Sequence, residues 1–243
     1  MPRYAMVTDL TKCVGCQACT AACNTEWSVP PGYARTRVKS TGALGTFPNL
    51  RSAFYVAQCN HCDNPPCVKP CPSGATGIAA NGIVKINREL CIGCGYCVEA
   101  CPYDARHIDP LAKKADKCDF CSSRLQTGLQ PACVTTCTAN AKFFGDLEDT
   151  DGGIFKMVYG QGSHRIEGPE AAPGPNVYYK GRRGEPELVA SVFPPRAPRM
   201  PASGQWLSRV LLPVAGLMVG ATFAGQAVAF FRQLGKGEER FEE

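Results

Sequence analysis

The residues of this chain with the clearest chemistry are its cysteines. There are 16 of them among 243 residues, and all fall into four groups of four with short internal spacing. The groups are Cys13, Cys16, Cys19 and Cys23; Cys59, Cys62, Cys67 and Cys71; Cys91, Cys94, Cys97 and Cys101; and Cys118, Cys121, Cys133 and Cys137. Thiolates are soft ligands for iron, copper and zinc. The pattern therefore predicts metal centres with sulfur ligands.

The spacing within the groups indicates which kind of centre this is. The third group reads Cys-x2-Cys-x2-Cys-x3-Cys-Pro, the run with which bacterial ferredoxins hold [4Fe–4S] clusters. The first group has the same spacing, and the second and fourth groups lengthen their middle interval to x4 and x11. Four such runs predict four [4Fe–4S] clusters, which together would carry single electrons.

The assignment of ligands follows from a rule of two-cluster ferredoxins, in which the fourth cysteine of each run binds the neighbouring cluster. The rule pairs the second group with the third and the first group with the fourth. The predicted sets are Cys13, Cys16, Cys19 and Cys137; Cys118, Cys121, Cys133 and Cys23; Cys59, Cys62, Cys67 and Cys101; and Cys91, Cys94, Cys97 and Cys71. A cluster bound by four cysteines of one group would contradict this hypothesis.

Two other uses of paired cysteines fit the sequence less well. Disulfide scaffolds belong to secreted proteins, and the N-terminus has neither an apolar signal segment nor twin arginines. Structural zinc needs two Cys-x2-Cys pairs per ion, whereas three of the four groups place a third cysteine within five residues of the second. A zinc-stabilised interaction protein is the alternative from a different functional class.

The elements that must position these cysteines are short. Apolar segments beside the groups predict strands at residues 4–7, 54–57, 83–86 and 142–144. Gly15, Gly93 and Gly95 stand where the loops must bend, because glycine tolerates a positive φ. We expect an α+β fold over residues 1–148, with two ferredoxin-like dicluster modules related by a pseudo-twofold axis, one interrupting the other.

The composition changes after residue 148. Residues 149–205 contain no cysteine but many Gly and Pro residues, which predicts an extended, non-helical segment with short strands at 176–180 and 187–193. Such a segment either wraps a partner or the cysteine-rich core, or is a disordered linker.

Residues 206–232 are predicted to form a single transmembrane helix, followed by a charged tail at 233–243. The 22 residues from 210 to 231 carry no charge, and at about 1.5 Å per residue they span about 33 Å. Gly216, Gly220 and Ala224 recur at four-residue spacing, which allows a partner helix to approach closely. A buried helix of a soluble domain is the alternative.

The basic residues on either side of the predicted span do not determine on which side of the membrane the cysteine-rich domain lies. Three basic residues precede the predicted span and three follow it: Arg196, Arg199, Arg209, Arg232, Lys236 and Arg240. The domain is therefore either cytoplasmic or periplasmic after export with a partner. The formal charge of +5 would turn negative with four clusters of about −2 each. No basic stripe with interleaved aromatic residues is present, so no nucleic-acid partner is expected.

Several phrases resemble one family. They are Cys59-Asn-His-Cys-Asp-Asn-Pro-Pro-Cys67, Lys117-Cys-Asp-Phe-Cys121 with Arg124 and Gly128, Pro131-Ala-Cys133, and Phe144-Gly-Asp146. Over residues 1–180 the chain resembles the four-cluster electron-transfer subunits of the dimethyl sulfoxide reductase group, which includes polysulfide and tetrathionate reductases and membrane-bound formate dehydrogenases. Thr138 stands where that family often has proline.

The resemblance implies a non-catalytic subunit that relays electrons between two partners. One would be a catalytic subunit with a molybdopterin cofactor, and the other a multi-span, quinone-binding membrane subunit. The cluster pair of the first and fourth groups would face the catalytic subunit, and the other pair the membrane. The iron–sulfur subunit of a membrane-bound nickel–iron hydrogenase is the alternative within this class, since its C-terminal helix is similarly placed. A free soluble polyferredoxin is a further alternative.

Overall fold

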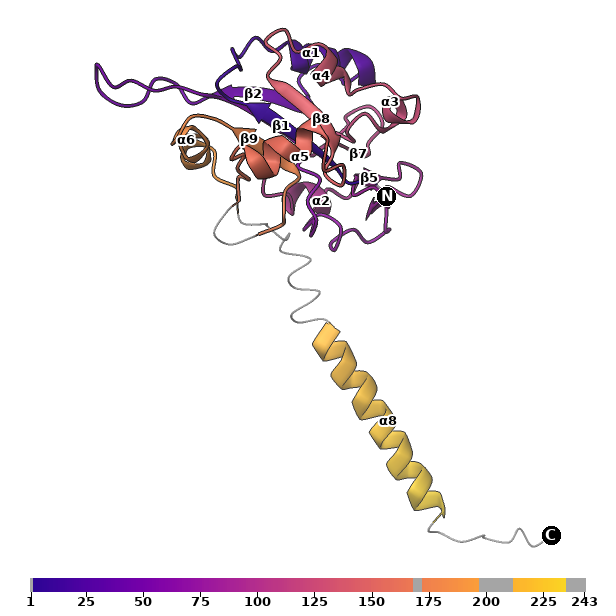
Figure 1. Cartoon of the computed structure of the whole chain (residues 1–243). Helices are drawn as coiled ribbons and strands as arrows, with labels where there is room; N and C mark the ends of the chain where they lie inside the picture. Colours follow the sequence, from indigo (N-terminus) through magenta and orange to yellow (C-terminus); the bar gives the residue numbers. More distant parts are fainter. Residues whose placement is uncertain (1, 168–171, 197–211, 235–243) are drawn as a thin grey trace, which may run out of the picture. The chain divides into compact units, whose positions relative to one another are not determined.

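The computed structural model of the chain describes residues 2–167, 172–196 and 212–234 (Figure 1). Contacts between Cα atoms divide the chain into two compact units, Met1–Arg199 and Met200–Glu243. In chain order the first unit contains β1 (Tyr4–Asp9), α1 (Ala18–Trp27), β2 (Thr36–Ser40), β3 (Phe54–Gln58), β4 (Thr76–Ile78), β5 (Val84–Ile86), α2 (Tyr96–Glu99), β6 (His107–Ile108), β7 (Ala115–Asp116), α3 (Ser122–Gln126), α4 (Ala132–Thr135), β8 (Lys142–Asp146), α5 (Gly153–Phe155), the π-helix η1 (Lys156–Gly160), β9 (Val177–Lys180) and α6 (Glu185–Val192). The predicted mixture of helices and strands is confirmed.

The central element is a three-stranded sheet with β1 in the middle. β8 pairs with β1 in the antiparallel sense and β9 in the parallel sense. Side chains alternate between the two faces of a strand. Met6 accordingly packs into the main core, whereas Ala5 and Val7 pack with Ile154 in a smaller cluster. All three β1 residues are inaccessible to solvent, which explains why an apolar run at the N-terminus predicts this strand correctly.

Three hairpins connect the cysteine groups. β2 pairs with β3 between the first and second groups, β4 with β5 between the second and third, and β6 with β7 between the third and fourth. α1 carries Cys19 and Cys23, α2 carries Cys97, and α4 carries Cys133. α1 also packs against α4, as Figure 1 shows, so the first and fourth groups lie side by side.

The segment after residue 148 departs from expectation. α5 and η1 are helical, so the predicted absence of helix is wrong there, and the predicted strand at 187–193 is wrong because α6 occupies it. Helix signals explain α6: Gly184 has φ +88°, Pro186 stands in the first turn, and Glu185 favours the positive end of the helix dipole.

The same segment completes the core. Tyr179 of β9 and Val189 of α6 are fully buried in the main core, where the Tyr179 hydroxyl donates to the Val56 carbonyl at 2.9 Å. Of the roles that the composition leaves open, wrapping of the cysteine-rich core is therefore the one observed for residues 177–192.

The second unit contains α8 (Leu212–Leu234). Its side chains are described over residues 217–228, where Leu217, Met218 and Phe223 are exposed. Among the described residues we find no helix with the length and apolarity needed to cross a bilayer. The start of the predicted span, residues 206–211, and nearly all of the predicted tail, residues 235–243, lie outside the described residues.

Candidate metal centres

All four cysteine groups contain the same left-handed turn. The residue before the second cysteine has a positive φ in each group: +69° at Gly15, +44° at His61, +72° at Gly93 and +56° at Phe120. Glycine marks this turn in two groups, and there the sequence predicts it correctly. At His61 and Phe120 a non-glycine residue adopts the strained conformation, so the residue type gives no signal there.

The first predicted ligand set lines one cavity. Its lining includes Cys13, Cys16, Cys19 and Cys137, and Val38 and Val56 contribute apolar walls. The backbone N–H of Ala141 donates to the sulfur of Cys137 at 3.2 Å. The hydroxyl of Thr138 lies 3.7 Å from the sulfur of Cys16. Two hydrogen-bonding groups therefore point at sulfurs of this set.

A second predicted set lines another cavity. Its lining includes Cys59, Cys62, Cys67 and Cys101, together with Pro65, Pro66 and Arg106. Burial raises the pKa of Cys67 to about 12. The positive charge of Arg106 opposes this shift, and the charge of Cys59 adds to it. Burial and the charges of Cys59 and Cys101 likewise raise the pKa of Cys62. Burial therefore disfavours the thiolate forms of Cys62 and Cys67, which a bound cation would stabilise.

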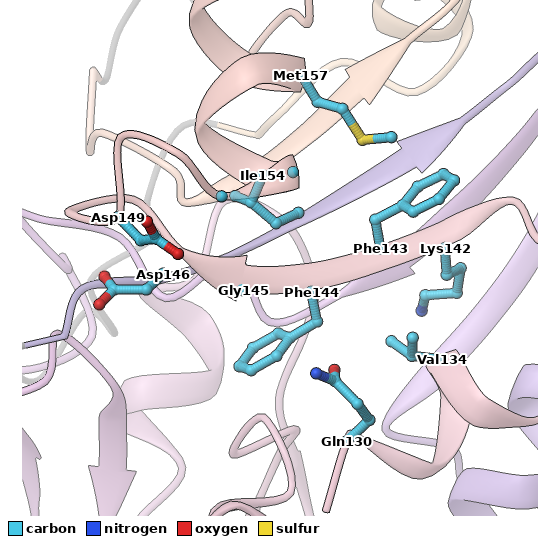
Figure 2. A pocket seen from close by; sticks show the side chains of 12 residues that line it. Gln130, Val134, Lys142, Phe143, Phe144, Gly145, Asp146, Asp149, Ile154 and Met157 are labelled. Carbon is cyan, nitrogen blue, oxygen red and sulfur yellow. The ribbon is translucent and has the colours of Figure 1, made fainter.

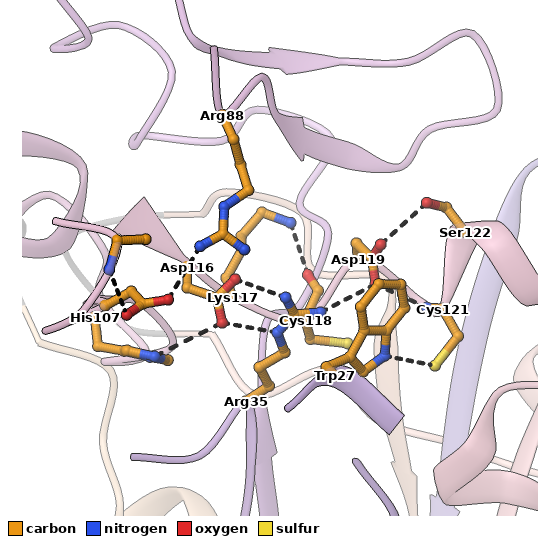
Figure 3. Close-up of polar contacts among 12 residues, drawn as sticks. Trp27, Arg35, Arg88, His107, Asp116, Lys117, Cys118, Asp119, Cys121 and Ser122 are labelled. Atoms are coloured by element: carbon orange, nitrogen blue, oxygen red, sulfur yellow. Dashed lines mark hydrogen bonds and ion pairs between the residues drawn. The ribbon is translucent and has the colours of Figure 1, made fainter. Parts of the chain in front are cut away.

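The third set gathers around α1 and α4. Burial and the charge of Cys133 raise the pKa of Cys23 to about 12, and the charge of Cys121 acts in the same direction. Burial and the charges of Cys23 and Cys133 also raise the pKa of Cys118. The indole N–H of Trp27 donates to the sulfur of Cys121 at 3.4 Å, as Figure 3 shows. The structure thus brings together four cysteines that are far apart in the sequence.

For the fourth set, the structure shows contacts that bring only some of the cysteines near one another. Cys97 belongs to a cluster of buried side chains with Ala115, and Cys91 packs against that cluster. The N–H of Ala115 donates to the sulfur of Cys91 at 3.4 Å. Cys94 is exposed, and Cys71 lies 3.8 Å from the hydroxyl of Ser73. Across the described residues, no group of three or more His, Cys, Asp or Glu side chains has the arrangement for a single metal ion. All four ligand sets remain predictions.

A buried ion pair lies beside the third set and contacts Trp27, whose indole reaches that set. Figure 3 shows Arg35 forked onto Asp116, with Nε to Oδ2 at 2.8 Å and Nη2 to Oδ1 at 2.7 Å. The guanidinium also lies 4.5 Å from the ring of Trp27, so it holds the indole that reaches Cys121. Sequence analysis did not identify Trp27, Arg35 or Asp116, because their connection arises only from the tertiary fold.

His61 and Phe120 connect two of the sets. Their rings stack with centroids 3.7 Å apart, and they occupy the same turn position in the second and fourth groups. His61 Nδ1 accepts the N–H of Val84 at 3.1 Å, while its Nε2 is buried and has no hydrogen-bond partner among the residues described. Burial, reinforced by the charges of Lys117 and Arg106, holds the pKa of His61 far below its usual range, so the ring is neutral.

The residues fit [4Fe–4S] clusters by their chemistry. Two cavities are each lined by four thiols of a predicted set, and N–H groups of Ala141, Ala115 and Trp27 point at sulfurs. Buried polar atoms of His61 and Arg106 lack hydrogen-bond partners among the described residues. Hydrogen bonds to the sulfurs are a usual feature of cluster sites and set their reduction potentials.

Comparisons with known proteins agree with this chemistry. Residues 50–147, which contain three of the four cysteine groups, match the family model of the 4Fe-4S dicluster domain. A tetrathionate reductase subunit of Salmonella typhimurium is 43% identical over 188 residues, which cover 74% of this chain and 72% of that protein. Protein NrfC of Escherichia coli is 44% identical, covering 68% of this chain and 75% of its own length. A polysulfide reductase subunit of Wolinella succinogenes is 43% identical, with coverage of 64% and 83%.

Proposed function

The chain belongs to the family of iron–sulfur subunits of the molybdopterin oxidoreductases, and from this premise we propose that it relays electrons through four [4Fe–4S] clusters within a respiratory complex. Each cluster, when bound, takes up and gives up one electron. The single observation that carries the proposal is the use of all 16 cysteines in four spaced groups, two of whose crossed sets line cavities.

The proposed clusters follow one another in a defined order. The charges of both Cys19 and Cys133 act on Lys142, which connects the first two sets, and the rings of His61 and Phe120, from the loops of the second and fourth groups, stack on each other. Cys67 and Cys97 share a buried cluster of side chains, which links the last two sets. These contacts support a linear relay with the first-group set at one end and the third-group set at the other.

The two ends of this relay suit docking to partners. Cys16 and Cys94 are the exposed cysteines, and beside them Val14 and Ile92 expose 62% and 67% of their surface. An exposed apolar side chain next to a cluster ligand favours a partner that excludes water there. We propose that a molybdopterin-containing catalytic subunit docks at the Val14 end, and a multi-span, quinone-reactive membrane subunit at the Ile92 end.

We further propose that the C-terminal helix attaches the complex to the bilayer. Support comes from the uncharged sequence of residues 210–231 and from the exposed apolar side chains of α8. Membranes from cells that express the full chain, or a chain ending at residue 205, would be washed with carbonate, which strips peripheral proteins. The full chain should stay in the pellet. Release of both proteins to the same extent would refute the anchor.

The cluster count has a direct test. Anaerobically purified protein should contain about sixteen irons and sixteen acid-labile sulfides per chain and absorb broadly in the visible range. A colourless protein that contains zinc would refute the proposal.

The crossed ligand sets need a separate test. Cys137→Ser should alter the same EPR signal as Cys13→Ser, and Cys23→Ser the same signal as Cys118→Ser. If Cys137→Ser and Cys118→Ser altered one common signal instead, each group would bind its own cluster and the crossed assignment would be wrong.

A further inference from the structure

Two buried cations occupy matching positions in the two proposed cluster pairs. Lys142 and Arg106 each stand five residues after the last cysteine of their group, Cys137 and Cys101, and each follows an alanine. They are 4% and 3% exposed. The corresponding positions after Cys71 and Cys23 hold the neutral residues Thr76 and Ser28, so each pair contains one such cation.

The side chain of Lys142 points toward the cysteines of the first and fourth groups. Figure 2 shows Lys142 and Phe144 on the face of β8 opposite to Phe143. The ammonium donates to the side-chain oxygen of Gln58 at 2.8 Å, and Lys142 lines the cavity of Cys13 and Cys137. Burial would favour the neutral amine, but the charges of Cys133, Cys19 and Cys118 outweigh it and raise the pKa of Lys142.

Arg106 has the equivalent surroundings in the other pair. Its Nη1 donates to the hydroxyl of Thr76 at 3.2 Å, and Nε and Nη2 have no hydrogen-bond partner in the described part of the chain. It lines the cavity of the Cys59 set, and the charges that act on it come from Cys67, Cys59, Cys97 and Cys101. Two of the predicted sets thus face one guanidinium.

Among the residues that the structure describes, neither cation has a carboxylate partner. Within the described part of the chain, the ion pairs formed by lysine and arginine involve other residues. A buried charge without compensation strongly destabilises a folded protein. Among the same described residues, the anionic groups that face Lys142 and Arg106 are the sulfur ligands of two sets each, so the compensating charge is that of the clusters.

We propose that Lys142 and Arg106 are paired positioning charges, one for each pair of clusters, that raise the reduction potentials of both clusters beside them. The inference rests on the proposed function. One-electron reduction adds one negative charge to a cluster and transfers no proton to either side chain, because both stay cationic. A fixed positive charge nearby therefore favours the reduced form, and it does so more strongly in a buried site than at the surface.

The experiment uses the full chain with its complex and replaces each cation by an uncharged side chain of similar length. Lys142→Met should lower two of the four midpoint potentials in an EPR-monitored redox titration, and Arg106→Met the other two. We expect at least a tenfold change in the reduction equilibrium, which is about 59 mV for a one-electron couple. Lys12→Met and Lys69→Met remove exposed charges near cysteines of the first and second groups, one in each cluster pair, and should leave all four potentials in place.

The outcomes separate this inference from the proposed function. Unchanged potentials at full iron content, or equal shifts in the Lys12 and Lys69 variants, would overturn the inference alone. If Lys142→Met loses iron while Lys142→Arg keeps it, the positive charge is required and the inference stands. If both lose iron, Lys142 serves packing and the inference is wrong. An unsubstituted protein without about sixteen irons would refute the proposed function instead.

Discussion

At the scale of single residues, the cysteine loops depend on backbone conformation as much as on sulfur. The same left-handed position recurs in all four groups, with glycine in two and larger residues in two. Adding a methyl group therefore has different consequences at different glycines. At Gly93 a Cβ atom would collide with the carbonyl oxygen of Lys113, whereas at Gly74 it would meet nothing within 4 Å.

Gly93→Ala should consequently disrupt the loop of the third group. The left-handed conformation alone costs a non-glycine residue about 1–2 kcal/mol, and the backbone collision adds to this cost. We expect fewer irons per chain and a lower thermal midpoint than for Gly74→Ala, whose glycine has φ +65° but free space around it. Equal effects of the two substitutions would show that the collision is relieved by a small shift of the chain.

Trp27 offers a finer test of sulfur hydrogen bonding. Trp27→Phe keeps a ring for Arg35 to stack on but removes the N–H that donates to Cys121. Since an N–H donor stabilises the more negative, reduced cluster, one midpoint potential should fall while the iron content stays constant. Redox titration followed by EPR measures this, and four unshifted midpoints would contradict the role given to the indole.

At the scale of elements, a buried ion pair joins parts of the fold that no strand pairing connects among the described residues. Arg35 stands just before β2 and Asp116 ends β7, and both residues are 7% exposed. The remaining ion pairs include exposed ones such as Arg196 with Asp104, where both side chains are 48% exposed. The two ion pairs differ in burial more than in N–O distance, and burial decides how much the loss of each pair lowers the free energy of unfolding.

Asp116→Ala should destabilise the protein far more than Arg196→Ala. The first change leaves the Arg35 guanidinium buried without its main partner, which costs about 3–5 kcal/mol. The second removes a surface pair worth at most about 1 kcal/mol. Urea unfolding of the anaerobic, cluster-loaded protein gives both free energies. A loss below about 1 kcal/mol for Asp116→Ala would mean that water or Asp119 replaces the missing carboxylate.

The same scale shows what the sequence can and cannot predict. Apolar runs at β1, β3 and β8 reveal strands because those strands are buried, and cysteine spacing reveals the groups because it is a local property. Residues 187–193 are apolar enough for a strand, yet Gly184 and Pro186 start a helix there. The contacts of Trp27 with Cys121, of Lys142 with Gln58 and of Arg106 with Thr76 cannot be predicted from the sequence, because each joins residues far apart along the chain.

At the scale of the whole molecule, the core of the first unit is partly inorganic in the proposed holo-protein. Ten of the 16 cysteines are buried, and several of them stand among the residues of the main hydrophobic core. Without metal these thiols would line cavities, which lose contacts on their inner side. Metal binding and folding are therefore expected to be coupled.

Removal of the iron should abolish cooperative unfolding. After anaerobic chelation we expect loss of the near-ultraviolet circular dichroism signal and a broad thermal transition, because the cavities of the Cys13 and Cys59 sets lose their contents. Treatment with the same chelator saturated with iron serves as the control. An iron-free protein with a sharp transition would mean that the polypeptide core is sufficient by itself.

The parallel pairing of β9 with β1 has a consequence for biosynthesis. β1 begins at Tyr4, but its parallel neighbour ends at Lys180, so most of the chain must leave the ribosome before the central sheet can close. Cys137 likewise reaches the cytosol long after Cys13. In the proposed crossed sets Cys137 completes the ligands Cys13, Cys16 and Cys19, so that cluster can be completed only after more than half of the chain has been translated.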